Sequence, residues 1–121
     1  MEGSRFTNEK TDVEEQVFRQ FGLDINDGLF HPEGNIPAKF LGKNGEKKEM
    51  LWGIRKGSHY TPETHAHAHT LTIEHGSGII SINGKEVAYK KGDSFEITGN
   101  TPHGFIRVDE TTIVKQEQPA R

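Results

Sequence analysis

Three histidines alternate with small residues near the middle of the chain, in the run Thr64-His65-Ala66-His67-Ala68-His69. In an extended strand, residues i and i+2 point to the same face about 6–7 Å apart, which is close enough to share one metal ion. The alanines between the histidines crowd nothing. A fourth histidine, His103, follows Pro102 much later in the chain. The candidate metal ligands are therefore His65, His67, His69 and His103.

A metal is the simplest reason for such a cluster, because stacked imidazoles without one repel each other when protonated. Imidazole-rich sites suit iron, manganese, nickel, copper or zinc, and the ligand type does not choose among these metals. We therefore expect a divalent transition metal as the cofactor. The remaining histidines, His31, His59 and His75, are isolated and are predicted to be ordinary polar residues.

Length and composition limit the kind of protein that carries this cluster. The chain has 121 residues, no cysteine and a formal net charge of -3. This length predicts one domain, and the lack of cysteine excludes disulfides, thiolate metal sites and cysteine nucleophiles. With 15 basic and 18 acidic residues and no basic cluster, nucleic-acid binding is not expected. The apolar runs are far shorter than the roughly 20 residues that cross a bilayer, and no secretory signal is visible. We expect no membrane contact and a cytoplasmic location.

Residues 1–35 are predicted to form an N-terminal arm and lead-in. Residues 12–21 favour a short helix that Thr11 or Asp12 caps and Gly22 ends. The apolar residues near one face of this helix are Val13, Val17, Phe18 and Phe21. An arm that docks only weakly is the alternative.

Residues 36–118 are predicted to form a single barrel domain, because short extended runs alternate there with turn residues. The expected strands cover residues 39–41, 49–54, 63–74, 79–82, 86–89, 94–97, 103–108 and 111–115. Two pairs, Asn44-Gly45 and Asn83-Gly84, are strong hairpin signals. The charged run over residues 43–49, with Lys47 and Lys48, is predicted to be a solvated hairpin edge that blocks strand addition.

From about Gly57 to Phe105 the chain resembles the cupin superfamily of small barrels. One family motif, G-x5-P-x-G-x2-H-x3-N, is matched in spacing from Gly92 onward. It departs from the family at three positions, with Thr98 for the proline, Asn100 for the second glycine and Arg107 for the final asparagine. His103 then takes the place of the metal ligand. Asparagine is a reasonable substitute for glycine because it tolerates a left-handed backbone. The resemblance implies an all-β fold, a double-stranded β-helix or jelly-roll barrel, with a short N-terminal arm or helix.

The other family motif, G-x5-H-x-H-x3,4-E-x6-G, is matched with a departure. Counted back from Gly76, the usual glutamate position falls on His69, and the two usual histidine positions fall on Glu63 and His65. The resemblance then implies that His65, His69 and His103 bind the metal, with Glu63 as a fourth candidate.

A second alignment stays open, in which the His67-x-His69-x4-Glu74 segment matches the start of the motif. It leaves Glu74 only two residues before Gly76, where the family has six residues between. We favour the first alignment, because alternation also keeps His69 on one face with the apolar Leu71 and Ile73. His67 remains a candidate ligand through a local bulge, and Glu63 and Glu74 are the candidate catalytic carboxylates.

Three further residues are candidates for substrate binding. Phe105 and Arg107 share the alternation of His103 and are expected to point into the barrel. Arg107 is interpreted either as a bidentate clamp for a substrate carboxylate or as a surface residue near a strand end. Trp52 is predicted to line the barrel, with stacking against a substrate as its less favoured role.

The resemblance leaves three functions open. The first is a metal-dependent enzyme, of the oxygenase, isomerase or lyase type, that acts on a small carboxylate, keto/enol or sugar-like substrate. The second is a metal-binding module that captures a small ligand without turnover. The third is a metal-free structural barrel, which the departure at the glutamate position favours. The family also implies pairing of two copies as a homodimer.

Overall fold

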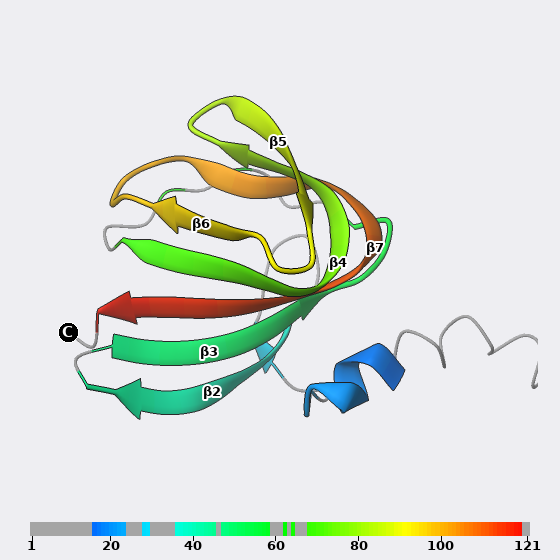
Figure 1. Cartoon of the computed structure of the whole chain (residues 1–121), viewed down its shortest axis with the longest axis vertical. Helices are drawn as coiled ribbons and strands as arrows, with labels where there is room; N and C mark the ends of the chain where they lie inside the picture. The colour runs from blue at the N-terminus through cyan, green and yellow to red at the C-terminus, as the bar shows by residue number, and fades with distance from the viewer. Residues whose placement is uncertain are drawn as a thin grey trace, which may run out of the picture.

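The computed structural model describes residues 16–23, 28–29, 36–45, 47–58, 62, 64 and 68–119. They form a helical turn over residues 16–20 and seven strands (Figure 1). The strands are β1 (Gly28–Leu29), β2 (Ile36–Asn44), β3 (Lys47–Ile54), β4 (His69–Ile82), β5 (Lys85–Lys90), β6 (Ser94–Ile97) and β7 (His103–Pro119). No helix in this part of the chain is long and apolar enough to cross a membrane.

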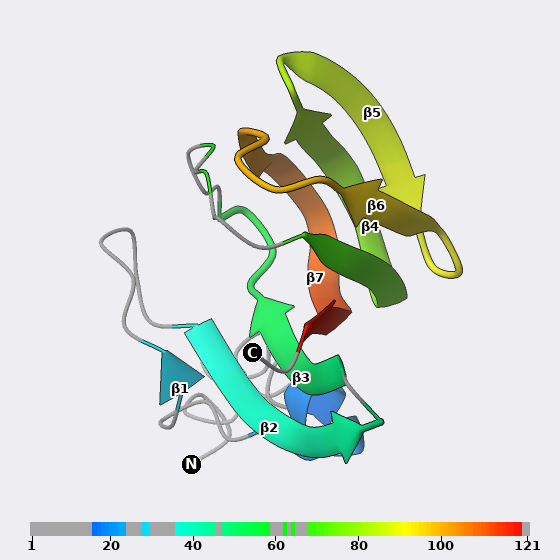
Figure 2. The same ribbon diagram turned by 90° about the vertical axis from the view of Figure 1, so that its left-hand side faces the viewer.

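All strand pairs are antiparallel, in the order β1-β2-β3-β7-β4-β5, and β6 pairs with β4. The first half of β7 pairs with the second half of β4, and the second half of β7 pairs with the first half of β4. Both long strands bend, so the sheet wraps around a common interior (Figures 1 and 2). This arrangement confirms the predicted all-β jelly-roll barrel.

The two long strands were expected to be broken, and they are continuous. β4 runs through the expected gap at residues 75–78, and β7 runs through Asp109 and Glu110 to Pro119. Gly76 lies in this bend of β4 with a φ of 102°, and the pairing of β4 with β7 shifts register around it. Bulges and a glycine therefore bend the strands where separate strands had been expected.

Both predicted hairpins are confirmed. Asn83 and Gly84 have φ values of 53° and 80°, and they connect Ile82 of β4 to its partner Lys85 of β5. Two successive residues with positive φ match the right-handed twist of the strands, which is why Asn-Gly occurs there. The first hairpin joins β2 to β3 through Gly45, whose φ is 68°.

The barrel interior is a single apolar core. Its buried residues are Ile54, Leu71, Ile73, Ile80, Tyr89, Ile97, Phe105, Val108 and Val114. Trp52, Phe95 and other half-buried side chains pack against this cluster. The core fixes which side of each strand faces inward and therefore which polar residues can meet inside the barrel.

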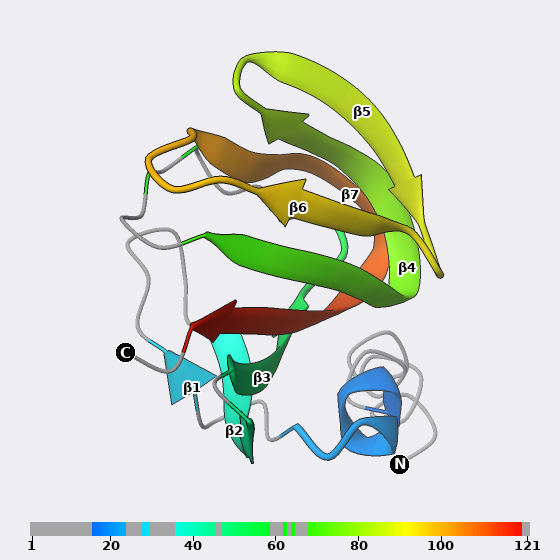
Figure 3. The same cartoon turned by 60° about the vertical axis from the view of Figure 1, so that its left-hand side comes forward.

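The helical turn covers the opposite face of β3 and β7 (Figure 3). It ends as predicted at Gly22, whose φ is 74°, and the Leu23 amide donates to the Phe18 carbonyl at 2.9 Å. This is the Schellman arrangement, in which the flanking apolar residues also touch. Phe18 and Leu23 are accordingly buried with Leu51 and Ile113 in a second cluster. The predicted caps Thr11 and Asp12, and Val13, lie outside the described residues.

Candidate metal centre

Two of the four candidate histidines lie together inside the barrel. His69 begins β4 and is 7% exposed, on the same face as the buried Leu71 and Ile73, as predicted by alternation. His103 begins β7. The two rings are 5.8 Å apart between centroids, at an interplanar angle of 68°. The fold thus brings together two imidazoles that are 34 positions apart in the sequence.

The His103 ring is held in one orientation by its own turn. Its Nδ1 atom lies 2.8 Å from the Thr101 carbonyl oxygen. A carbonyl only accepts hydrogen bonds, so Nδ1 carries the proton and the neutral ring has its lone pair on Nε2. The turn itself is shaped by Asn100, whose φ of 61° confirms the left-handed conformation expected at a glycine position. A hydrogen bond of this kind orients the ring as metal-binding histidines require.

The separation of the His69 and His103 rings fits the binding of one metal ion by both. Two imidazoles that bind one ion through nitrogen at about 2.1 Å have ring centres roughly 5–6 Å apart, close to the separation of His69 and His103. The other candidates, Glu63, His65 and His67, lie outside the described residues. Over the residues that are described, no group of three or more potential ligands occurs. Which of the three joins the pair stays a prediction.

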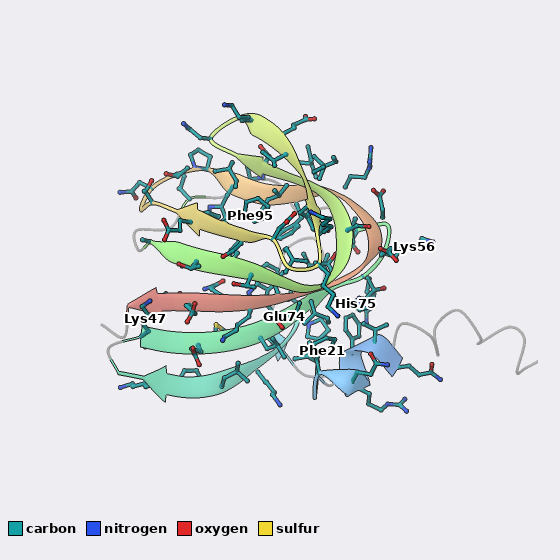
Figure 4. All side chains as sticks on the ribbon, viewed as in Figure 1. Phe21, Lys47, Lys56, Glu74, His75 and Phe95 are labelled. Carbon is teal, nitrogen blue, oxygen red and sulfur yellow. The ribbon has the colours of Figure 1, made fainter. Side chains whose placement is uncertain are left out.

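Glu74 lies on the outside of the barrel. Alternation from the inward His69, Leu71 and Ile73 places Glu74 on the outer face, and the β4–β7 register shifts only after Ile73, before His75. Figure 4 shows Glu74 and His75 near Phe21, and the His75 ring packs edge-on against Phe21 with centroids 6.2 Å apart. Glu74 therefore does not share the inward face of His69, which removes the geometric basis of the second motif alignment and of a catalytic role for Glu74 there.

The expectation that Arg107 points into the barrel is wrong. Across β4, Ile79 lies opposite Arg107 and Ile80 lies opposite Phe105, so β7 carries one extra residue between them. Such a bulge reverses the alternation that continues from His103. The Arg107 side chain is 64% exposed and bonds both carboxylate oxygens of Asp109, at 3.0 and 3.1 Å. It is a surface ion pair rather than part of the barrel lining.

Phe105 and Trp52 do line the interior, as predicted. The Trp52 ring meets the Phe105 ring edge-on at 5.7 Å between centroids, and the Tyr89 ring meets Phe105 at 5.3 Å. Phe105 is 3% exposed, so it is a core residue in this conformation. Whether either ring touches a substrate stays a prediction.

Tyr89 is held as a buried hydrogen-bond donor. The Thr112 hydroxyl donates to the Glu110 carbonyl at 2.9 Å, so the Tyr89 hydroxyl must be the donor in its 2.8 Å bond to Thr112. Burial raises the pKa of Tyr89 to about 12, with a smaller lowering by the Thr112 hydrogen bond and a raising by the Asp109 charge. Tyr89 is therefore protonated at neutral pH.

This raised pKa predicts a loss of stability in alkali. Between pH 10 and 12 the unfolded chain has released the tyrosine proton while the folded chain keeps it, so the free energy of unfolding falls as pH rises. We expect this contribution to reach roughly 2 kcal/mol near pH 12. Urea unfolding at pH 9 and pH 11.5 should show a smaller fall for Tyr89→Phe than for the unchanged chain. Equal falls in both would contradict the assignment.

Sequence reasoning missed a chain of polar side chains on the inner face. The Trp52 indole Nε1 donates to Gln116 Oε1 at 3.1 Å, and Gln116 Nε2 donates to Gln118 Oε1 at 2.8 Å. The last strand was expected to end at Lys115, so these glutamines were not considered. The signal was present, because both continue the alternation of the inward Val114.

A jelly-roll barrel with two histidines meeting inside it defines the class of protein. The sequence profile of the Cupin_2 family, described as a cupin domain, matches residues 50–115. Because this match covers more than half of the 121 residues, the chain belongs to the cupin family. No curated protein sequence matches it.

Solved structures agree with the fold. An RmlC-like cupin from Shewanella frigidimarina matches with a TM-score of 0.67 and 18% identity, over 78% of this chain and 82% of its own. KdgF from Halomonas sp. matches with a TM-score of 0.66 and 17% identity, over 85% and 90%. The polyketide cyclase RemF from Streptomyces resistomycificus matches with a TM-score of 0.65 and 16% identity, over 82% and 73%. At these identities the likeness concerns the fold.

Proposed function

We propose that this cupin is a metal-dependent enzyme that acts on a small oxygenated substrate inside the barrel. The observation that carries the proposal is the His69–His103 pair, with rings 5.8 Å apart and His103 oriented by Thr101. The proposed ligand set is completed by one or two of three further residues, His65, His67 and Glu63. A bound divalent ion would supply Lewis acidity to a substrate oxygen.

This chain's own residues supply the surroundings of that reaction. Trp52, Phe105 and Tyr89 form a set of edge-on aromatic contacts in the apolar interior, in which Phe105 follows His103 by two residues along β7. Tyr89 keeps its proton at neutral pH, so it does not serve as the base. With Glu74 outside the barrel, Glu63 is the remaining candidate carboxylate for proton transfer.

The names of similar structures suggest where to look for turnover. They include a polyketide cyclase and DMSP lyases, so cyclisation and elimination belong in the assay beside oxygenation and isomerisation. The test incubates the protein, loaded in turn with iron, manganese, nickel, copper or zinc, with diketones, keto acids and uronate-like sugars. We expect product with at least one metal and none with His103→Ala. Saturable binding without product for any metal would favour the ligand-binding module instead.

A further inference from the structure

The strand register assembles a row of polar residues across the inner face, at the end of the barrel where His69 lies. Thr70 is opposite Glu117, so one step further His69 comes opposite Gln118 across β4 and β7. Gln118 is in turn paired with Lys48 of β3. Strands lie about 4.8 Å apart, so the side chain of Gln118 starts about 5 Å from that of His69, and that of Lys48 about 10 Å from it. In Figures 1 and 2 the start of β4, the end of β7 and the start of β3 lie at the same end of the barrel.

The orientation of the Gln118 amide is determined by the chain of hydrogen bonds behind it. An indole nitrogen only donates, so the Gln116 atom that meets Trp52 is an oxygen and its other amide atom is a nitrogen. That nitrogen donates, so the Gln118 atom that meets it is an oxygen. The remaining amide atom of Gln118 is the NH2 group. Among the described residues, no hydrogen bond from this group is present.

Lys48 extends this donor row. Alternation from the inward Trp52 along β3, which pairs with β7 without a register shift, places Lys48 on the inner face. The opposite alternation is visible outside, where Glu49 pairs with Lys115 at 3.7 Å. Lys48 is half-buried, and it forms no ion pair within the described part of the chain. Lys47 is exposed, as predicted, but Lys48 is half-buried. The predicted sheet edge at these lysines is wrong, because β3 pairs with β2 on one side and with β7 on the other.

We propose that Gln118 and Lys48 form an anion-binding subsite that holds the carboxylate of the substrate, while another oxygen of the same molecule lies at the His69–His103 pair. The amide NH2 of Gln118 and the Lys48 ammonium offer the two donors that a carboxylate takes. The exposed Lys43, opposite Lys48 on β2, adds a further positive charge at the outer end of the row. The strand spacing fits a short molecule in which the two groups lie about 5–10 Å apart. The inference rests on the proposed function, because it takes the histidine pair as the reacting end.

The neighbouring row of residues on the same face indicates what chemical group adjoins the carboxylate in such a substrate. This row crosses four neighbouring strands, and its paired residues are, in order, Leu71 of β4, Gln116 of β7, Met50 of β3 and Phe40 of β2. Phe40 is 59% exposed, so an apolar surface adjoins the donor row. An organic acid with an apolar segment next to its carboxylate matches both rows.

Trp52 provides a direct readout of this subsite. It is the only tryptophan in the chain, and its indole N–H begins the hydrogen-bond chain that ends at Gln118. The experiment titrates the metal-free, nitrogen-15-labelled full chain with 4-oxopentanoate, and separately with its neutral methyl ester, and follows the indole resonance by NMR. We expect the acid to bind at least tenfold more tightly than the ester.

Three variants separate the subsite from general surface charge. Gln118→Glu keeps the acceptor for Gln116 and replaces the NH2 group by a negative oxygen, so the acid should bind at least tenfold more weakly. Lys48→Met keeps the aliphatic stem and should have a similar effect, whereas Lys47→Met, on the neighbouring outward position, should leave both affinities unchanged. Equal effects of the two lysine changes, or no preference for the acid in the unchanged chain, would overturn the subsite. A chain that prefers the acid but never binds a metal would overturn the proposed function and leave the subsite standing.

Discussion

Replacing His69 by alanine should weaken divalent metal binding by roughly 100-fold or more, because the loss of a ligand exceeds the 10–100-fold typical of an orienting partner. The ring is buried, shares its face with Leu71 and Ile73, and lies 5.8 Å from the His103 ring. Competition with a chromophoric chelator measures the affinity directly. Thermal unfolding of the metal-free protein checks that the variant still folds.

Glu74→Ala is the matched control on the same strand. Glu74 follows the inward Ile73 and lies on the outer face, near His75 and Phe21. We expect its metal affinity to stay within a factor of two or three of the unchanged chain. A larger loss from Glu74→Ala than from His69→Ala would mean that the second motif alignment, with Glu74 as a ligand, is correct.

The largest effect on stability is expected from Gly76→Ala. A Cβ atom there would lie 2.5 Å from the Thr111 carbonyl oxygen and 2.7 Å from the Thr112 Cα, and the φ of 102° is strained for any residue with a side chain. The strained backbone costs about 1–3 kcal/mol and the overpacking about 1–3 kcal/mol. At roughly 4 °C per kcal/mol, the midpoint of thermal unfolding should fall by about 10 °C or more.

Two other glycines separate these contributions. Gly84 has a φ of 80° and open space around it, so Gly84→Ala tests the backbone strain alone. At Gly78 no positive φ is present, but a Cβ would collide with the Arg107 carbonyl oxygen and crowd the Tyr89 hydroxyl, so Gly78→Ala tests the packing alone. Gly76→Ala should be more destabilising than either. A Gly76→Ala variant as stable as Gly84→Ala would show that β4 relaxes around the new methyl group.

Local signals in the sequence predicted much of the fold correctly. The Asn83-Gly84 turn, the helix end at Gly22 and the left-handed Asn100 all depend on the backbone preferences of one or two residues. Alternation likewise placed His69 correctly, because β4 is regular from His69 to Ile73. These features need no knowledge of distant contacts.

The errors have different causes along the two long strands. The extra residue between Phe105 and Arg107 depends on how β7 pairs with β4, which is distant in sequence. Alternation along β7 alone therefore predicted the wrong face for Arg107. Glu74 lies outside because it directly follows the inward Ile73, so alternation from His69 already excluded it from the inner face. The inward Gln118 was missed because its strand was ended too early, at Lys115. Pairing of two copies and the domain boundary at residue 36 stay predictions.

The metal content of the protein tests the central claim most directly. Purification of the untagged chain without chelators, followed by mass spectrometry of the metals against protein concentration, gives the stoichiometry. The account predicts about one equivalent of one divalent transition metal, and its loss in a His69→Ala, His103→Ala double variant that remains folded. A chain that arrives empty and takes up none of iron, manganese, nickel, copper or zinc would contradict it.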